Sequence, residues 1–147
     1  EKALTEYYRA LAAAASCGLF DCLGHVDLYR RTAYIRDERD IEHGPVHEAA
    51  AAFVAAAAAH GTGLEINGRN GTAGPAYLCP GPSLLKMAVN AGIRTFTIGS
   101  DAHEPTAVGA GGEVARCALL AAGIDQVATF ERRKAIYRQL CHPAGLA

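Results

Sequence analysis

Hydrophobic positions along this chain alternate between helical spacing and short continuous runs. Between residues 4 and 15 apolar side chains recur at helical spacing, and Gly18 follows where a helix-ending glycine is expected. The next segment, LFDCLGHVD at 19–27, is a short apolar run that ends at polar residues, as buried strands do. The N-terminal part of the chain therefore predicts a helix followed by a buried strand.

The same pairing of helix and strand recurs further along the chain. Residues 45–60 are dominated by alanine, which predicts a helix, and TGLEIN at 62–67 predicts the second strand. A third helix is expected in SLLKMAVNAG at 83–92, with Ser83 as its N-cap. The third strand is expected in RTFTIGSDAH at 94–103, which is rich in β-branched and aromatic residues.

The final pair is a helix over 113–122 and a strand in QVATF at 126–130. An arginine-rich loop at 29–40 and a loop rich in glycine and proline at 68–82 separate the earlier elements. Alternation of helices with apolar strands predicts an α/β fold whose parallel strands are joined by helical crossovers, either in part of a barrel or in a doubly wound sheet. We expect a single domain over residues 1–147, which is long enough to bury a sizeable core.

Composition narrows the possible partners and the compartment. Half of the residues are hydrophobic and the net charge is -1, so a nucleic-acid partner is not expected. The longest apolar stretch is short and rich in alanine, and the N-terminal segment lacks a basic region and a cleavage site, so neither a membrane span nor a signal peptide is expected. The 5 cysteines include no C-x-x-C pair, which favours a reducing, cytoplasmic setting over a disulfide framework.

Candidate chemistry gathers where three predicted strands end. The carboxyl ends of parallel strands share one face, and in α/β architectures that face holds the functional site. The polar residues at these three ends are His25 and Asp27, Glu65 and Asn67, and Asp101 and His103.

These residue types favour the binding of a metal ion. Carboxylate oxygens and imidazole nitrogens suit zinc, manganese or iron, and His25, Asp101 and His103 could converge on one ion. Each motif alone also has a structural explanation, because GHVD can form a turn and SDAH can cap a helix.

Other residues are expected to have structural roles. His43, His47, His60 and His142 are expected to be solvated. A glycine-rich stretch at 109–112 could cradle a phosphate, but without a P-loop lysine it is better explained as a turn.

These motifs together resemble the polymerase-and-histidinol-phosphatase (PHP) family, and within it the histidinol-phosphatase branch. The segment YYRALAAAASCGLFDCLGHVDLYRR is similar to the helix, strand and GHxD motif of that branch, and GTGLEING is similar to its strand ending in EIN. The block YLCPGPSLLKMAVNAGIRTFTIGSDAHEPTAVG resembles the branch in order and spacing, and VATFERRKAIYRQL resembles its closing strand and tail.

The resemblance implies a distorted (β/α)7 barrel that binds two or three zinc, manganese or iron ions and hydrolyses a small phosphate monoester, as in histidine biosynthesis. By this resemblance His25, Asp101 and His103 would be metal ligands. The candidates for binding the substrate phosphate are Arg30, Arg31 and Arg69. The residues that would orient the metal ligands without binding the ion themselves are Asp27, Glu65 and Asn67.

The sequence departs from the family pattern in two places. The H-x-H motif of the family's first strand is absent, so we expect the C-terminal half of the barrel, with little or no activity by itself and with a tendency to associate with a missing N-terminal half or a second copy. After EIN, Arg69 precedes the position of the family's arginine, where this chain has Thr72. A non-catalytic scaffold and a phosphoesterase or nuclease of other specificity are the alternatives.

Overall fold

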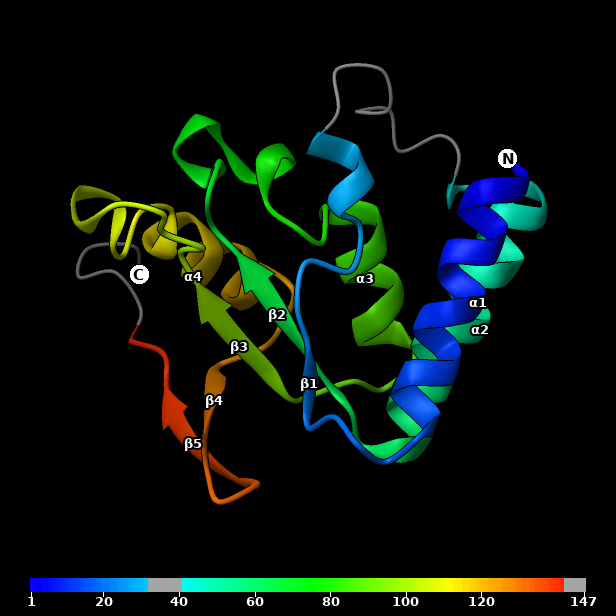
Figure 1. Ribbon diagram of the computed structural model, residues 1–147. Helices are drawn as coiled ribbons and strands as arrows, with labels where there is room; N and C mark the ends of the chain where they lie inside the picture. The colour runs from blue at the N-terminus through cyan, green and yellow to red at the C-terminus, as the bar shows by residue number, and fades with distance from the viewer. Residues whose placement is uncertain (32–40, 142–147) are drawn as a thin grey trace.

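A computed structural model describes residues 1–31 and 41–141 (Figure 1). Most of the predicted loop at 29–40, and His142, lie outside these described residues. The centre of the fold is a parallel sheet of three strands, in the order β1 (Cys22–Leu23), β2 (Gly63–Asn67) and β3 (Phe96–Gly99). Sequence order and spatial order coincide, so each crossover places the next strand beside the previous one.

Helices precede or follow these strands as the hydrophobic pattern predicts. They are α1 (Lys2–Ser16), α2 (Gly44–His60), α3 (Pro82–Asn90) and α4 (Gly112–Ala121). Parallel strands alternating with helices confirm the predicted α/β class. The prediction of Ser83 as the N-cap of α3 is wrong, because Gly81 is the N-cap and the helix begins at Pro82. Proline is well tolerated there, since the first turn of a helix does not use its N–H groups.

The core lies between the sheet and the helices. Leu64 and Ile66 of β2 and Phe96 of β3 are completely buried. The helices α1 and α2 lie side by side (Figure 1). Their contact includes the rings of Tyr8 and Phe53, whose centroids are 6.1 Å apart. Burial of these side chains holds the strand ends at fixed positions, which the site requires.

The last strand departs from the predicted pattern. β4 (Gln126–Glu131) pairs antiparallel with β5 (Lys134–Gln139) in a separate two-stranded sheet, so the expectation of a fourth parallel strand is wrong. Arg132 and Arg133 both have positive φ, 49° and 66°, which is the backbone of a tight hairpin turn. The hairpin is tied to the main sheet by the hydroxyls of Tyr137 and Thr95, 2.8 Å apart.

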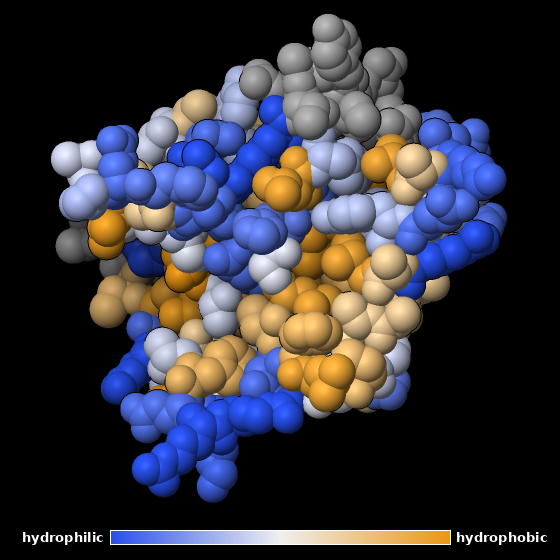
Figure 2. Space-filling model, in the orientation of Figure 1, coloured by the Kyte–Doolittle hydropathy of each residue, from blue (hydrophilic) through white to orange (hydrophobic). Residues whose placement is uncertain are grey.

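One face of the parallel sheet carries no described helix (Figure 1). Among the described strands, β1 has a neighbour on only one side. Figure 2 shows apolar surface over the middle of this face and polar surface towards its edges. Leu19 and Phe20, which come just before β1, are 72% and 49% exposed. None of the described helices is both long and apolar enough to cross a membrane.

Candidate functional site

The polar residues predicted at the strand ends do lie at the carboxyl end of the sheet. His25 follows β1 and Asp101 follows β3, and both have positive φ, 34° and 49°. Apart from the two arginines of the hairpin turn, they are the described non-glycine residues with this backbone conformation. Such strain persists only where surrounding contacts enforce it, and it concentrates at functional sites.

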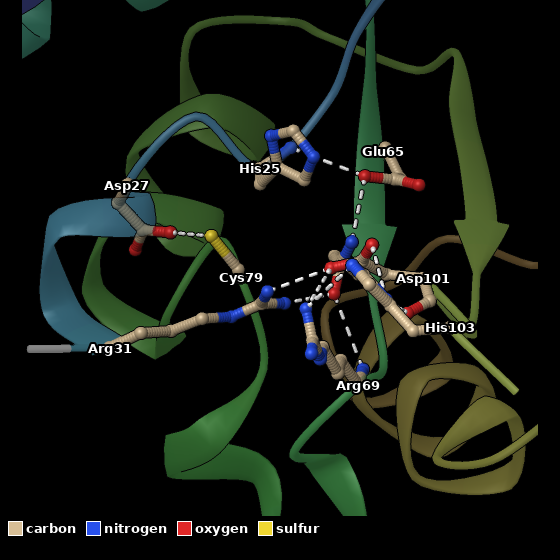
Figure 3. Close-up of polar contacts among 9 residues, drawn as sticks. His25, Asp27, Arg31, Glu65, Arg69, Cys79, Asp101 and His103 are labelled. Carbon is tan, nitrogen blue, oxygen red and sulfur yellow. Dashed lines mark hydrogen bonds and ion pairs between the residues drawn. The ribbon is translucent and has the colours of Figure 1, made fainter. Parts of the chain in front are cut away.

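The carboxylate of Asp101 is held by arginine. Arg31 Nη1 donates a hydrogen bond of 2.7 Å to Asp101 Oδ2, and Arg69 Nη1 lies 3.7 Å from the same oxygen (Figure 3). The hydrogen bond from Arg31 is the largest influence that lowers the pKa of Asp101 below its ordinary value. The carboxylate is therefore anionic and is matched by two cationic side chains.

His103 is placed in a single tautomer by its neighbours. Its Nε2 lies 3.2 Å from Arg69 Nη1, which can only donate, so Nε2 accepts that hydrogen bond. The proton of the neutral ring is then on Nδ1, which donates to the backbone oxygen of Asp101 at 2.8 Å. The imidazole side chain is 63% exposed, so it borders solvent at the mouth of the site.

The fully buried Asn67 connects this cluster to β2. Its Oδ1 accepts hydrogen bonds from Arg31 Nη2 and from the backbone N–H of Arg69, the latter at 3.2 Å. Its Nδ2 donates to Glu65 Oε2 at 3.2 Å. The same Glu65 oxygen accepts the backbone N–H of His25, also at 3.2 Å. A continuous set of contacts therefore runs from β1 across β2 to the segment after β3.

Asp27 and Arg30 belong to a second, buried cluster. Asp27 accepts hydrogen bonds from the Cys79 thiol, from the backbone N–H of Gly81 at 2.7 Å and from Arg30 Nη1 at 3.2 Å. Arg30 also donates to the backbone oxygens of Leu78 and Ala76, at 3.0 and 2.8 Å. These contacts join the turn after β1 to the loop before α3.

Burial dominates the electrostatics of this second cluster. Removal from water raises the pKa of Asp27 above its ordinary value even though three donors favour the anion. Burial and the neighbouring Asp27 carboxyl likewise raise the pKa of the Cys79 thiol. Cys79 is therefore a protonated hydrogen-bond donor and not a reactive thiolate.

Two hollows open on this part of the surface. The larger, of about 310 Å³, is bordered by the Asp101 cluster, and its polar lining residues are Arg69, Asn70, Ser100, Asp101, His103 and Glu104. The smaller, of about 170 Å³, is bordered by the second cluster and includes Asp27, Arg30, Arg31, Asn70, Tyr77 and Cys79. Arg31 therefore lines the smaller hollow while its guanidinium reaches Asp101, which borders the larger one.

The structure brings most of the predicted site residues together but separates two of them. Arg31, Asn67, Arg69, Asp101 and His103 share direct contacts. Glu65 joins them through Asn67, and His25 joins through the contact of its backbone N–H with Glu65. Asp27 and Arg30 lie in the second cluster. Sequence reasoning missed Cys79 and Gly81 as partners of Asp27. No local pattern marks them, because the contact joins residues that are distant along the chain.

The predicted metal ligands form no complete site in the part of the chain that the structure describes. There, no group of at least three His, Cys, Asp or Glu side chains is arranged to hold an ion. Nδ1 of His103 lies 3.8 Å from Asp101 Oδ1, but it hydrogen-bonds the Asp101 backbone and the other carboxylate oxygen binds Arg31. These donors alone do not fit a metal centre, which needs three or more protein ligands on one ion.

Comparison with known proteins identifies a relative that is similar in sequence to most of this chain. The chain is 35% identical over 104 residues to a probable histidinol-phosphatase of Deinococcus radiodurans. The aligned region covers 71% of this chain and 36% of that protein, so the chain spans little more than a third of the relative's length. No family model matches the chain.

Proposed function

We propose that this chain forms part of the active site of a phosphatase that hydrolyses a small phosphate monoester. The observation that carries the proposal is the contact of Arg31 and Arg69 with the Asp101 carboxylate at the carboxyl end of the sheet, beside a hollow lined by Arg69, Asp101 and His103. The similarity to a probable histidinol-phosphatase over most of the chain supports the same class of reaction. The C-terminal half of a PHP barrel is the corresponding proposal for the fold.

Two guanidinium groups on one carboxylate make a site that can exchange that carboxylate for phosphate. Arg31 and Arg69 both reach Asp101 Oδ2, so their donors already converge on a single anionic oxygen. Guanidinium groups bind phosphate oxygens through paired hydrogen bonds, so a phosphate monoester placed between them would gain two charge-assisted contacts. Asp101 would hold both cations in place until the substrate arrives.

Hydrolysis of a monoester breaks the bond between phosphorus and the alcohol oxygen as water adds to phosphorus, and the alcohol leaves with one of the two protons of that water. The arginines would stabilise negative charge on the phosphoryl oxygens as that bond breaks. When phosphate engages Arg69, His103 Nε2 loses its hydrogen-bond donor and becomes free to accept another group. These are the roles that we propose for the side chains in this cluster; Arg30 remains a predicted phosphate ligand whose observed contacts are to Asp27 and to carbonyl groups.

Zinc, manganese or iron ions are part of the proposal through the resemblance of the motifs. The proposed donors are His25, Asp101 and His103, and donors from outside the described residues would be needed to complete an ion site. A bound divalent ion would supply activation of water near neutral pH. The proposal therefore predicts that residues beyond the described part of the chain take part in the reaction.

The test compares the chain alone with a completed protein. We expect the 147-residue chain to show little or no turnover of histidinol phosphate or of an aryl phosphate, with manganese or zinc added. Joining it to the region of the Deinococcus radiodurans relative that the alignment does not cover should produce turnover, and Arg31→Ala in the joined protein should lower it. Robust turnover by the chain alone would contradict the incomplete site, and an inactive, folded joined protein would contradict the phosphatase proposal.

A non-catalytic scaffold is the second candidate. It is favoured by the finding that the described residues assemble no group of three metal donors. Metal ions that bind the folded chain would raise its melting temperature, because they stabilise only the folded state. A melting temperature that manganese and zinc leave unchanged, in both the chain and the joined protein, would favour the scaffold.

A further inference from the structure

We propose that Glu65 is a positioning residue that fixes the orientation of the Asn67 amide and, through it, the Arg31 guanidinium. Glu65 lies on β2, and Figure 3 shows its carboxylate beside His25. The inference rests on the proposed function in one respect, which is that Arg31 binds phosphate. The positioning itself concerns contacts within the chain.

Two glycines make room for the Glu65 carboxylate. A Cβ added to Gly99 at the end of β3 would lie 2.1 Å from Glu65 Oε1, and one added to Gly24 after β1 would lie 3.1 Å from Oε2. Neither glycine has a positive φ, so backbone conformation does not require glycine at these positions. The space beside Glu65 is what distinguishes Gly99, because a side chain there would displace the carboxylate.

One oxygen of this carboxylate organises the neighbouring donors. Oε2 accepts hydrogen bonds from the backbone of His25 and from Asn67 Nδ2, each at 3.2 Å. The contact with His25 supports a backbone whose φ of 34° is unfavourable for a residue with a side chain. Glu65 therefore restrains both the turn after β1 and the Asn67 side chain.

The orientation of an asparagine amide is decided by what surrounds its two ends. With Nδ2 towards Glu65, Oδ1 of Asn67 faces the donors of Arg31 and the Arg69 backbone. The reversed amide would place its oxygen against the Glu65 carboxylate and its NH2 against the Arg31 guanidinium, so acceptor would meet acceptor and donor would meet donor. Glu65 therefore reinforces, from the Nδ2 end, the orientation in which Oδ1 holds Arg31.

Arg31 carries this restraint to the site. Its Nη2 is fixed by Asn67 Oδ1 while its Nη1 donates to Asp101 Oδ2. A guanidinium held at two nitrogens is set in its plane, which is what paired hydrogen bonding to a phosphate needs. Without Glu65, the Asn67 amide loses the acceptor that holds its Nδ2, so the anchor that Asn67 provides for Arg31 is weakened.

The test uses four single variants of the full chain and one double variant, Glu65→Ala with Gly99→Ala. Glu65→Ala removes the acceptor, whereas Glu65→Gln keeps an oxygen that can accept both hydrogen bonds. Gly99→Ala pushes the carboxylate aside without removing it. Gly112→Ala is the matched control, because a Cβ there meets no atom within 4 Å and its φ is not positive.

The first measurement follows the Asn67 amide and Arg31 guanidinium resonances by NMR, together with hydrogen exchange at the Arg31 nitrogens. Glu65→Ala and Gly99→Ala should shift these resonances and speed exchange about tenfold, the equivalent of one hydrogen bond. Glu65→Gln and Gly112→Ala should stay within about twofold of the unchanged chain. In the Glu65→Ala background, Gly99→Ala should add nothing, because the methyl group then occupies vacated space.

Unchanged resonances and exchange in a folded Glu65→Ala variant would overturn the inference. A full additional effect of Gly99→Ala in the Glu65→Ala background would overturn it as well, since the methyl group would then act by another route. Circular dichroism and melting temperature identify a variant that fails to fold. If Glu65→Ala fails to fold, Glu65→Gln decides the question, because the inference requires its Asn67 and Arg31 resonances and its hydrogen exchange to match those of the unchanged chain.

The second measurement titrates inorganic phosphate into the same proteins. Its dissociation constant should rise about tenfold in Glu65→Ala and Gly99→Ala and stay within about twofold in Glu65→Gln. If the unchanged chain binds no phosphate, the proposed role of Arg31 fails while the spectra still decide the positioning. If phosphate binds equally well in all variants, Glu65 does not act on the phosphate site, and the inference is overturned.

Discussion

Asp101 combines a strained backbone with a fully matched charge. Its φ of 49° is uncommon for a residue with a side chain, although aspartate tolerates it better than most. The contacts with Arg31 and Arg69 offset that strain by placing two cations on its carboxylate. At the scale of single residues, the site is therefore a carboxylate whose position and charge depend on Arg31.

Replacing Arg31 should change the titration of Asp101. Arg31→Ala is expected to raise the pKa of Asp101 towards its ordinary value of 3.8, because the largest influence lowering it is removed. Arg31→Lys keeps the charge but lacks the two separate nitrogens that reach Asp101 and Asn67, so it should give a value between the two. A titration of the Asp101 carboxyl carbon by NMR measures this, and an unchanged pKa in Arg31→Ala would contradict the pairing.

The ion pair of Arg31 and Asp101 also makes the stability of the fold depend on pH. Because the pKa of Asp101 is lower in the folded protein than in the unfolded chain, the pair stabilises the fold above about pH 4. That stabilisation is lost as the pH falls through the folded pKa. In Arg31→Ala the free energy of unfolding should therefore depend less on pH in this acidic range.

Adjacent arginines show why residue roles were only partly predictable. Arg30 and Arg31 are equivalent in the sequence, and both were predicted to bind phosphate. In the structure both belong to the 3-10 helix Leu28–Arg31, in which successive side chains point about 120° apart. Arg30 therefore faces the buried Asp27, while Arg31 faces the end of the sheet.

At the scale of elements, the glycine-rich segment before α4 joins two parts of the site. A Cβ added to Gly111 would lie 2.0 Å from the backbone oxygen of Gly68, which follows β2. Gly111 also has a positive φ of 71°. The close approach of these two backbones places the loop before α4 beside the residue that precedes Arg69, so glycine at 111 is required for packing and for conformation.

Replacing Gly111 should lower the free energy of unfolding by more than conformational strain alone would. Gly111→Ala is expected to lower the free energy of unfolding by about 2–5 kcal/mol, from strain and from the clash together. Gly109→Ala is the control, because Gly109 also has a positive φ but an added Cβ meets nothing within 4 Å. Its expected cost is about 1 kcal/mol. Equal costs in urea unfolding would contradict the role of the close approach.

The elements themselves were largely predictable, with one exception. Helices and parallel strands follow the hydrophobic period and the flanking glycines, which depend on local residues. The segment QVATF was correctly predicted to be a strand, but its pairing with Lys134–Gln139 was not predicted. Strand composition does not specify a partner, and the turn at Arg132 and Arg133 lacks the glycine or asparagine that signals a tight hairpin.

At the scale of the whole molecule, the described residues leave one edge of the parallel sheet, at β1, without a neighbouring strand. β1 is an edge strand among those described, and the exposed Leu19 and Phe20 lie immediately before it. Open edges and exposed apolar side chains favour association with a further polypeptide. We propose that the occupant is the remainder of a longer phosphatase or, in its absence, a second copy of this chain.

Association of the isolated chain should therefore depend on this edge. Sedimentation velocity over a range of concentrations is expected to show self-association, and Leu19→Ser with Phe20→Ser should shift the chain towards monomer. Val108→Ser is the control, because Val108 is 73% exposed but lies in the segment between β3 and α4. A monomeric unchanged chain at all concentrations, or an equal effect of the control, would contradict the proposal.

By itself, the sequence determined the α/β class, the places of the helices and strands, and the gathering of polar residues at the strand ends. Each of these follows from hydrophobic period and from the common direction of parallel strands. Only the tertiary structure decided that Arg31 binds Asp101, that Arg30 joins a buried cluster with Cys79, and that Glu65 lies between two glycines. Those contacts join residues that are far apart in the sequence, so their partners are set by packing and not by any local pattern.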